Sequence, residues 1–300
     1  MHFPAPVIRV GLRAMRTLFE SDRVGLDAKR RLVDVIAGAT TPPPGCRFSL
    51  EHVAGLPVHR VHLTRRTRGT LIYLHGGGYA LGSAKGYRSF VAQIADAAAM
   101  DALVPEYSLA PESPHPTALR EVARLYEHLL DDGLDPASVV IAGDSAGGGL
   151  TMALALDLRD RGLPLPAGLG LISPWLDLAR DIDRRRSARR DPLMAPSLIS
   201  EWAVPYVGSG DPQAPAISPV YGDLAGLPQV VVHSSGDDPI AVDADRLHEQ
   251  FVAQGWADRI RMQTYENLWH VLHLQHGFLS AADTAVAEFG AAVSDFVRDA

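Results

Sequence analysis

The sequence has one cysteine, an excess of acidic residues and no long apolar run. Cys46 has no second cysteine with which to pair, so an intrachain disulfide is excluded. The net charge of −7 argues against a nucleic-acid partner, because nucleic acid is bound by excess positive charge. No run of about 18 apolar residues occurs, and the first residues lack a basic stretch followed by an apolar one. We therefore expect no membrane span, no signal peptide and a cytoplasmic protein.

The rest of the composition fits one large globular unit. A chain of 300 residues with 47% hydrophobic content can bury a substantial core. One basic cluster interrupts the acidic background and has acids on both sides: Arg184, Arg185, Arg186, Arg189 and Arg190. We interpret this cluster as a solvated helix face or loop, with phosphate binding as the alternative.

Apolar residues recur at helical spacing within residues 1–40. They define two amphipathic helices, the first with Ile8, Leu12, Met15 and Phe19 on one face and the second with Ala28, Leu32 and Ile36. Three consecutive prolines at 42–44 cannot continue a helix and mark a boundary. We predict that residues 1–45 form the N-terminal helices of a cap.

The pattern changes to strands after residue 46. Two alternating runs, at 47–53 and 57–63, predict an antiparallel edge hairpin. Nearly continuous apolar runs follow, separated by helical stretches, at 70–74, 101–107, 138–142, 168–173, 229–235 and 259–264. This alternation predicts an α/β fold whose central, mostly parallel sheet has helices on both faces.

A long insertion separates the strands predicted at 168–173 and 229–235. An insertion of this length is expected to have helices and a function of its own. We assign residues 176–222 to the helical cap, together with residues 1–45, and residues 46–300 to the catalytic domain that carries the insertion.

Two motifs predict an acyl-transfer site. Residues 143–147 read Gly-Asp-Ser-Ala-Gly between a predicted strand and a predicted helix, which is the pattern of a nucleophile elbow around Ser145. The elbow turn is strained and brings two backbones close together, so its flanking residues must be small. Residues 75–78 read His-Gly-Gly-Gly, and such a loop can bring backbone N–H groups close to an oxyanion.

With these motifs the sequence resembles the hormone-sensitive-lipase-like branch of the α/β-hydrolases, which includes many bacterial carboxylesterases. Residues 107–112 read Tyr-Ser-Leu-Ala-Pro-Glu where this branch has Tyr-Arg-Leu-Ala-Pro-Glu, so Ser108 departs from the usual arginine. The resemblance extends from about Ile72 to the C-terminus. It implies the α/β-hydrolase fold and no cofactor.

A serine at its ordinary pKa is a poor nucleophile, so Ser145 needs a base and an acid that orients the base. In this fold the acid follows the nucleophile along the chain and the base comes last. The relatives place the acid directly before a proline, which selects Asp238 and leaves Asp237 as a turn-forming carboxylate. His270 follows the last strand as the base, in a loop where Asn-Leu replaces the usual Gly-Met.

The resemblance assigns the oxyanion donors to the backbone N–H groups of Gly77, Gly78 and Ala146. It also implies that His75 holds the glycine loop, whereas His233, on a core strand, is expected to be a hydrogen-bonded core residue.

Three histidines follow one another at a spacing of three residues: His270, His273 and His276. At this spacing they would drift around a helix, and no carboxylate or cysteine completes a ligand set. We therefore predict no metal site and expect His273 and His276 on a helix surface.

Five aromatic residues near the predicted cap indicate an apolar pocket, with ordinary core packing as the alternative: Tyr79, Trp175, Trp202, Tyr206 and Trp269. The sequence as a whole predicts a serine carboxylesterase that cleaves small, mostly apolar esters through an acyl-enzyme. A lactone hydrolase or a serine peptidase of the same fold is an alternative. A third is a ligand-binding receptor on an inactive hydrolase scaffold, although such receptors lack the catalytic histidine. A homodimer is compatible with the sequence.

Overall fold

The computed structural model describes residues 2–65, 67–179 and 190–297. Its eight strands form one sheet in the order β1-β2-β4-β3-β5-β6-β7-β8. The strands are β1 Arg47–Val53, β2 Leu56–His62, β3 Thr70–Leu74, β4 Asp101–Pro105, β5 Val139–Asp144, β6 Gly168–Ile172, β7 Gln229–Ser235 and β8 Ile260–Tyr265. β1 pairs antiparallel with β2, and β2 pairs antiparallel with β4, while the other neighbours are parallel. The predicted mostly parallel sheet with an antiparallel edge is confirmed.

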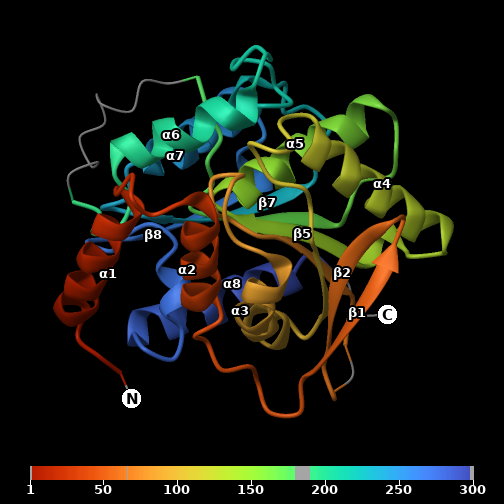
Figure 1. The fold of residues 1–300 in the computed structure, drawn as a ribbon. Helices are drawn as coiled ribbons and strands as arrows, with labels where there is room; N and C mark the ends of the chain where they lie inside the picture. Colours follow the sequence, from red (N-terminus) through yellow and green to blue (C-terminus); the bar gives the residue numbers. More distant parts are fainter. Residues whose placement is uncertain (1, 66, 180–189, 298–300) are drawn as a thin grey trace.

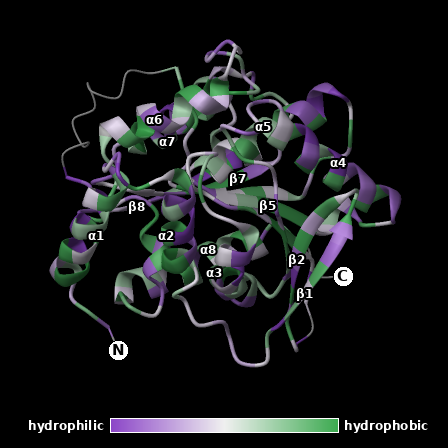
Figure 2. Ribbon diagram, in the orientation of Figure 1, coloured by the Kyte–Doolittle hydropathy of each residue, from purple (hydrophilic) through white to green (hydrophobic). Residues whose placement is uncertain are grey.

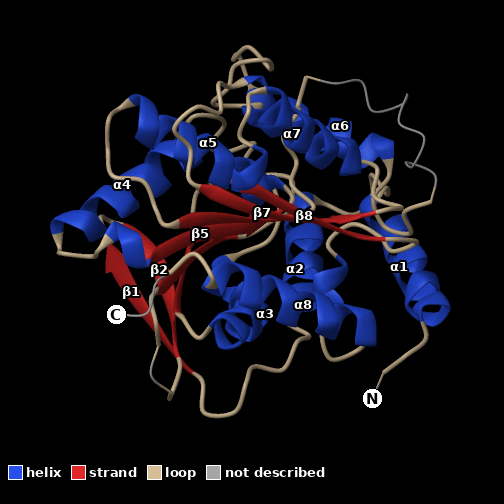
Figure 3. Cartoon of the chain, turned by 180° about the vertical axis from the view of Figure 1, so that it is seen from behind, coloured by secondary structure: helices blue, strands red, loops and turns tan. Residues whose placement is uncertain are grey.

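Helices cover both faces of the sheet (Figure 3). They are α1 Ala5–Phe19, α2 Leu26–Ala37, α3 Ala84–Ala98, α4 Thr117–Asp131, α5 Ala146–Asp160, α6 Pro196–Val207, α7 Ala241–Ala253 and α8 Ser280–Ser294. α3 and α8 lie on one face, and α4, α5 and α7 lie on the other (Figure 1). In Figure 2 the central strand β5 is largely hydrophobic, whereas α4 at the rim carries many hydrophilic residues.

The sheet divides the core into two layers because side chains alternate along each strand. In β3, Leu71 and Tyr73 pack in the layer of α3 and α8, and Ile72 and Leu74 pack in the layer of α4 and α5. All four are buried, as expected for a strand with helices on both sides.

The predicted cap segments lie at the carboxyl end of the parallel strands, where α1 bonds to the loops after β7 and β8 and α2 to the loop after β3. In Figure 1, α1 and α2 lie there side by side, and α6, from the insertion, lies near them. An ion pair joins Lys29 of α2 to Glu201 of α6, with 3.1 Å between Nζ and Oε1. In the basic cluster, Arg190 is exposed, and the other four arginines, at 184–186 and 189, lie outside the described residues. None of the helices that the structure describes is long and apolar enough to cross a membrane.

Candidate active site

Ser145 lies at the turn between β5 and α5. Its φ of 51° is in the left-handed region, which is strained for a residue with a side chain. A Cβ atom on Gly147 would overlap the Leu74 carbonyl oxygen, and one on Gly143 would lie 2.5 Å from the Gly147 oxygen. Glycine is therefore required on both sides of the serine, as the sequence motif indicates.

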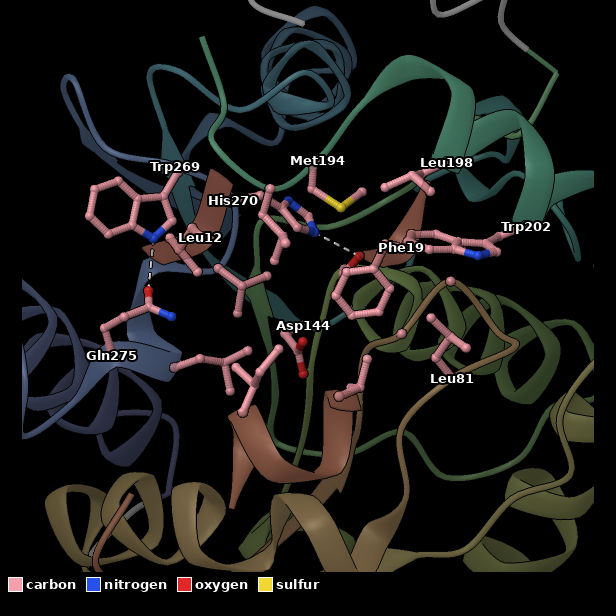
Figure 4. A pocket seen from close by; sticks show the side chains of 18 of the residues that line it. Leu12, Phe19, Leu81, Asp144, Met194, Leu198, Trp202, Trp269, His270 and Gln275 are labelled. Atoms are coloured by element: carbon pink, nitrogen blue, oxygen red, sulfur yellow. Dashed lines mark hydrogen bonds between the residues drawn. The ribbon is translucent and has the colours of Figure 1, made fainter. Parts of the chain in front are cut away.

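The three residues predicted as nucleophile, base and acid lie in one hydrogen-bonded chain. His270 Nε2 is 2.9 Å from Ser145 Oγ (Figure 4), and His270 Nδ1 is 2.7 Å from Asp238 Oδ2. Asp238 is fully buried, and its other oxygen accepts the backbone N–H of Ile240 at 2.9 Å. A carboxylate at Nδ1 keeps the proton on that nitrogen and leaves the Nε2 lone pair for the serine hydroxyl.

The surroundings of His270 raise its basicity. Burial by itself lowers the pKa of the imidazole, but the charge of Asp238 and its hydrogen bond, with the charges of Asp191 and Asp144, outweigh that effect. The pKa of His270 therefore lies above its ordinary value. An imidazole of this kind can take a proton from a hydroxyl group near neutral pH.

Asp191 is a carboxylate beside the site that the sequence analysis did not single out. It is buried, and its Oδ2 accepts the backbone N–H of His270 at 2.7 Å. Its Oδ1 accepts the N–H groups of Leu193 at 2.8 Å and Met194 at 2.7 Å. Burial, followed by the charge of Asp238, raises the pKa of Asp191 to about 6. Asp191 thus connects the insertion to the histidine loop.

The glycine loop lies against the elbow and is fastened there by Asp144. The buried Asp144 carboxylate accepts the N–H of Gly76 at 2.9 Å and the hydroxyl of Tyr73 at 3.0 Å. Gly77 and Gly78 follow with φ of 119° and 63°, conformations that favour glycine. Gly77 and Gly78 of the predicted oxyanion loop line the same cavity as Ser145.

His75 packs beneath this loop. Its Nδ1 is 2.8 Å from the Gly76 oxygen, and its ring stacks on Tyr107 with 4.4 Å between centroids. Burial lowers the pKa of His75 to about 4, so the ring is neutral and Nδ1 can donate to the carbonyl. This position agrees with a structural role in holding the loop.

Ser145 lines a cavity of about 80 Å³, and Figure 4 shows side chains that surround this cavity. Apolar side chains dominate its lining and come from α1, α2, the insertion and the histidine loop; they include Leu12, Phe19, Ile36, Leu198, Trp202 and Trp269. Two of the five predicted pocket aromatics, Trp202 and Trp269, thus line it. Tyr79, Tyr206 and Trp175 do not: the two tyrosines stack on each other, with 3.6 Å between ring centroids, and all three are buried in the core.

The prediction that His273 lies on a helix surface is wrong. His273 belongs to the 3₁₀ turn Leu272–Gln275, is 1% exposed, and places Nε2 at 3.1 Å from Nδ1 of the buried His233. The turn packs this side chain beneath β7, which a helical spacing could not reveal. His276 is partly buried and lies 3.8 Å from Asp283. Among the described residues, no three histidines, cysteines or carboxylates are grouped so that they could hold a metal.

The comparisons with known proteins agree with this geometry. The family described as having the alpha/beta hydrolase fold matches residues 71–274, which is more than half of the chain. The chain belongs to this family. The hydrolase is 53% identical, over 97% of its own length and 94% of the relative's, to a protein of Mycobacterium tuberculosis named as acetyl-hydrolase LipR. It is 35% identical to an acetyl-hydrolase of Streptomyces hygroscopicus, over 83% and 82% of the two chains.

Solved structures show the same relationship. The hydrolase superposes on an esterase of the bacterial hormone-sensitive lipase family with a TM-score of 0.90, at 30% identity, over 99% of its own chain and 100% of the other. It superposes on EstE5 with a TM-score of 0.90, at 32% identity, over 97% of both chains. The predicted branch and fold are confirmed, and the hydrolase is an enzyme of the carboxylic ester hydrolase class.

Two arginines of the N-terminal helices contact the active-site loops of the hydrolase, and sequence reasoning missed both. Arg30 of α2 donates to the carbonyl oxygen of Ala80, after the glycine loop, at 2.9 Å, and forms two bonds to Glu112 at 2.8 and 2.7 Å. The second is Arg9 of α1, which binds Asp237. Nothing local distinguishes Arg9 and Arg30 from the other arginines of these helices.

Ser108, which stands where the related sequences have an arginine, donates its hydroxyl to Glu121 at 2.7 Å.

Proposed function

We propose that this hydrolase cleaves small, mostly apolar carboxylic esters through an acyl-enzyme intermediate on Ser145. The observation that carries the proposal is the hydrogen-bond chain from Ser145 through His270 to Asp238 at the floor of an apolar cavity. Neutral His270 takes the hydroxyl proton as Ser145 Oγ attacks the ester carbonyl carbon. Asp238 then stabilises the imidazolium that forms.

The tetrahedral intermediate places negative charge on the former carbonyl oxygen. We assign its stabilisation to the backbone N–H groups of Gly77, Gly78 and Ala146, because the two glycines line the cavity and Ala146 begins α5. His270 passes its proton to the leaving alcohol as the acyl-enzyme forms. The same imidazole then takes a proton from water, whose oxygen attacks the acyl carbon, and returns the proton to Ser145 as the acid leaves.

The cavity favours a short apolar acyl group. Its volume of about 80 Å³ and its apolar lining leave little room for a long or charged substituent. Two relatives are named as acetyl-hydrolases, which agrees with a short acyl group. We assign residues 1–45 and 176–222 to a cap that excludes water and limits acyl length, because side chains of both segments line the cavity.

A substrate panel tests the proposal. We expect kcat/KM to be highest for p-nitrophenyl acetate or butyrate, and lower for the octanoate, a γ-lactone and a peptidyl p-nitroanilide. Phe19→Ala should enlarge the cavity and move the preference toward longer acyl chains. Leu18→Ala is the matched control, because Leu18 is the neighbouring residue, is 47% exposed and is outside the cavity lining.

Other outcomes would identify the alternatives. A kcat/KM that is higher for the lactone or the anilide than for the p-nitrophenyl esters would identify a lactone hydrolase or a peptidase instead. Binding of an ester without turnover would favour the receptor, which the hydrogen bond between His270 and Ser145 opposes.

A further inference from the structure

Arg9, in the middle of α1, binds three segments that are distant in sequence. Its Nη2 donates to Asp237 Oδ2 at 2.8 Å and to the Asn267 carbonyl oxygen at 2.9 Å, and its Nη1 donates to the Arg190 carbonyl oxygen at 2.7 Å. The guanidinium carbon also lies 5.3 Å from the ring centroid of Trp269. One side chain of the cap thus joins the acid loop, the histidine loop and the insertion.

These contacts are close to the proposed acid and base. Asp237 directly precedes Asp238, and Asn267 lies three residues before His270. The two loops also meet directly, because the backbone N–H of Asp237 donates to the carbonyl oxygen of Leu268 at 2.9 Å. Arg9 therefore lies at the junction that sets the distance between the two catalytic side chains.

The histidine loop needs such external contacts because its backbone is strained. Val271, directly after His270, has a φ of 48° in the left-handed region, which is strained for a β-branched residue; Asn267 has a φ of 59° in the same region, which asparagine tolerates better. The Val271 end is bound by the Ser173 hydroxyl, which accepts its N–H at 3.2 Å. Arg9 binds the Asn267 end.

The Asp237 carboxylate in turn depends on the guanidinium group of Arg9. The Asp237 side chain is 8% exposed, and a carboxylate with so little solvent requires a nearby cation. Among the described residues, Arg190 is the other cation at Asp237, but it is 73% exposed and its Nη1 is 3.9 Å from Asp237 Oδ1. The planar guanidinium of Arg9 offers several fixed donors, so it can bind a carboxylate and two carbonyl groups together.

We propose that Arg9 is a positioning residue that holds the Asp238 loop and the His270 loop in register for catalysis. The inference rests on the proposed function, in which Asp238 and His270 act as acid and base. It gives the N-terminal cap a part in the chemistry in addition to covering the cavity.

The pH dependence of activity separates positioning from a simple effect of charge. The carboxylates that act on His270 are Asp238, Asp191 and Asp144. If Arg9 acted only through its charge, its removal would leave Asp237 negative and raise the pKa of His270. If Arg9 positions the loops, its removal loosens the bond between Asp238 and His270, and the pKa falls.

The experiment compares Arg9→Gln and Arg9→Lys with Arg13→Gln in the full chain. Arg13 is the matched control, because it lies one turn further along α1 and is exposed. Active sites are titrated with an organophosphate, and kcat, KM and the pH profile of kcat/KM are measured with p-nitrophenyl acetate. For Arg9→Gln we expect kcat per titrated site to fall about 10- to 100-fold, by analogy with groups that orient the ligands of a catalytic metal. KM should change little and the acid limb should move to lower pH.

Arg9→Lys should recover part of this loss, since an ammonium group can still bind Asp237, and Arg13→Gln should behave as the wild type. The inference is overturned if Arg9→Gln matches Arg13→Gln, or if its acid limb moves to higher pH. Should Arg9→Gln not fold, Asp237→Asn decides: a kcat about tenfold lower supports the inference, and an unchanged kcat overturns it. Full activity in Ser145→Ala would instead refute the proposed function itself.

Discussion

Gly78 has no room for a side chain, which makes the predicted oxyanion loop sensitive to a single methyl group. A Cβ atom on Gly78 would lie 2.7 Å from Cε3 and 2.9 Å from Cδ2 of the Trp202 ring. Carbon atoms in contact are ordinarily about 3.5–4.0 Å apart. Gly78→Ala therefore forces either the ring or the loop to move by about 1 Å.

The size of the effect follows from two separate costs. The backbone at Gly78 has a φ of 63°, and an alanine in that conformation costs about 1–2 kcal/mol of stability. An oxyanion donor must lie about 2.7–3.1 Å from the oxyanion, so a displacement near 1 Å removes it. Loss of one donor lowers kcat by about 10²- to 10³-fold, or about 2.7–4 kcal/mol. We expect Gly78→Ala to show both effects.

Two further variants separate strain from steric overlap. Gly133 also has a positive φ, of 91°, but no atom lies within 4 Å of its Cβ position. Gly133→Ala should therefore lose stability in urea unfolding and keep its kcat. Gly78→Ala should lower kcat less in a Trp202→Ala background than in the wild type, because the ring that its methyl group overlaps is gone. Wild-type kcat in Gly78→Ala, or the same fold-loss with and without Trp202, would exclude this steric effect.

Three further predictions concern the acid, the base and a buried histidine. Asp238→Asn should lower kcat by about 10⁴-fold, far more than Asp237→Asn, because only Asp238 bonds to the imidazole of His270; the reverse ranking in folded variants would reassign the acid. Activity should fall on acidification with a midpoint above pH ~6.5, since the carboxylates raise the pKa of His270; a kcat/KM that stays flat to pH ~5 would exclude a neutral histidine base. Burial lowers the pKa of the His233 imidazole to about 3, so only the unfolded chain takes up this proton below pH ~6.5, and the free energy of unfolding should fall by about 2 kcal/mol from pH 7 to 5. In urea unfolding, His233→Asn should lose less free energy of unfolding over this pH range than the wild type, and equal losses in the two proteins would contradict this assignment.

Most of the fold could be predicted because local patterns carry it. Each apolar run became a strand whose ends lie within two residues of the prediction. The strand predicted at 101–107 ends at Pro105, after which Tyr107 turns to donate its hydroxyl to the His75 carbonyl oxygen. That bond joins residues 32 positions apart, and no local pattern announces it.

The chemistry of the site was predictable for a different reason. The strained elbow and the close glycine loop permit few residue types, so Ser145 and the loop at 75–78 are visible as motifs. Contacts between distant segments have no such signature: Arg9 and Asp237 are 228 residues apart, and Asp191 and His270 are 79 residues apart. The burial of His273 likewise depends on how a short turn packs, which its spacing from other histidines does not encode.

The central claim is that Ser145, activated by His270, is the attacking nucleophile. The most direct test is mass spectrometry of the wild type and of Ser145→Ala after incubation with a fluorophosphonate, combined with peptide mapping. We expect one adduct per wild-type chain, on the peptide that carries Ser145, and no adduct on the variant, whose ester turnover should fall by several orders of magnitude. An adduct on another residue, or a Ser145→Ala protein that hydrolyses esters at the wild-type rate, would exclude Ser145 as the nucleophile.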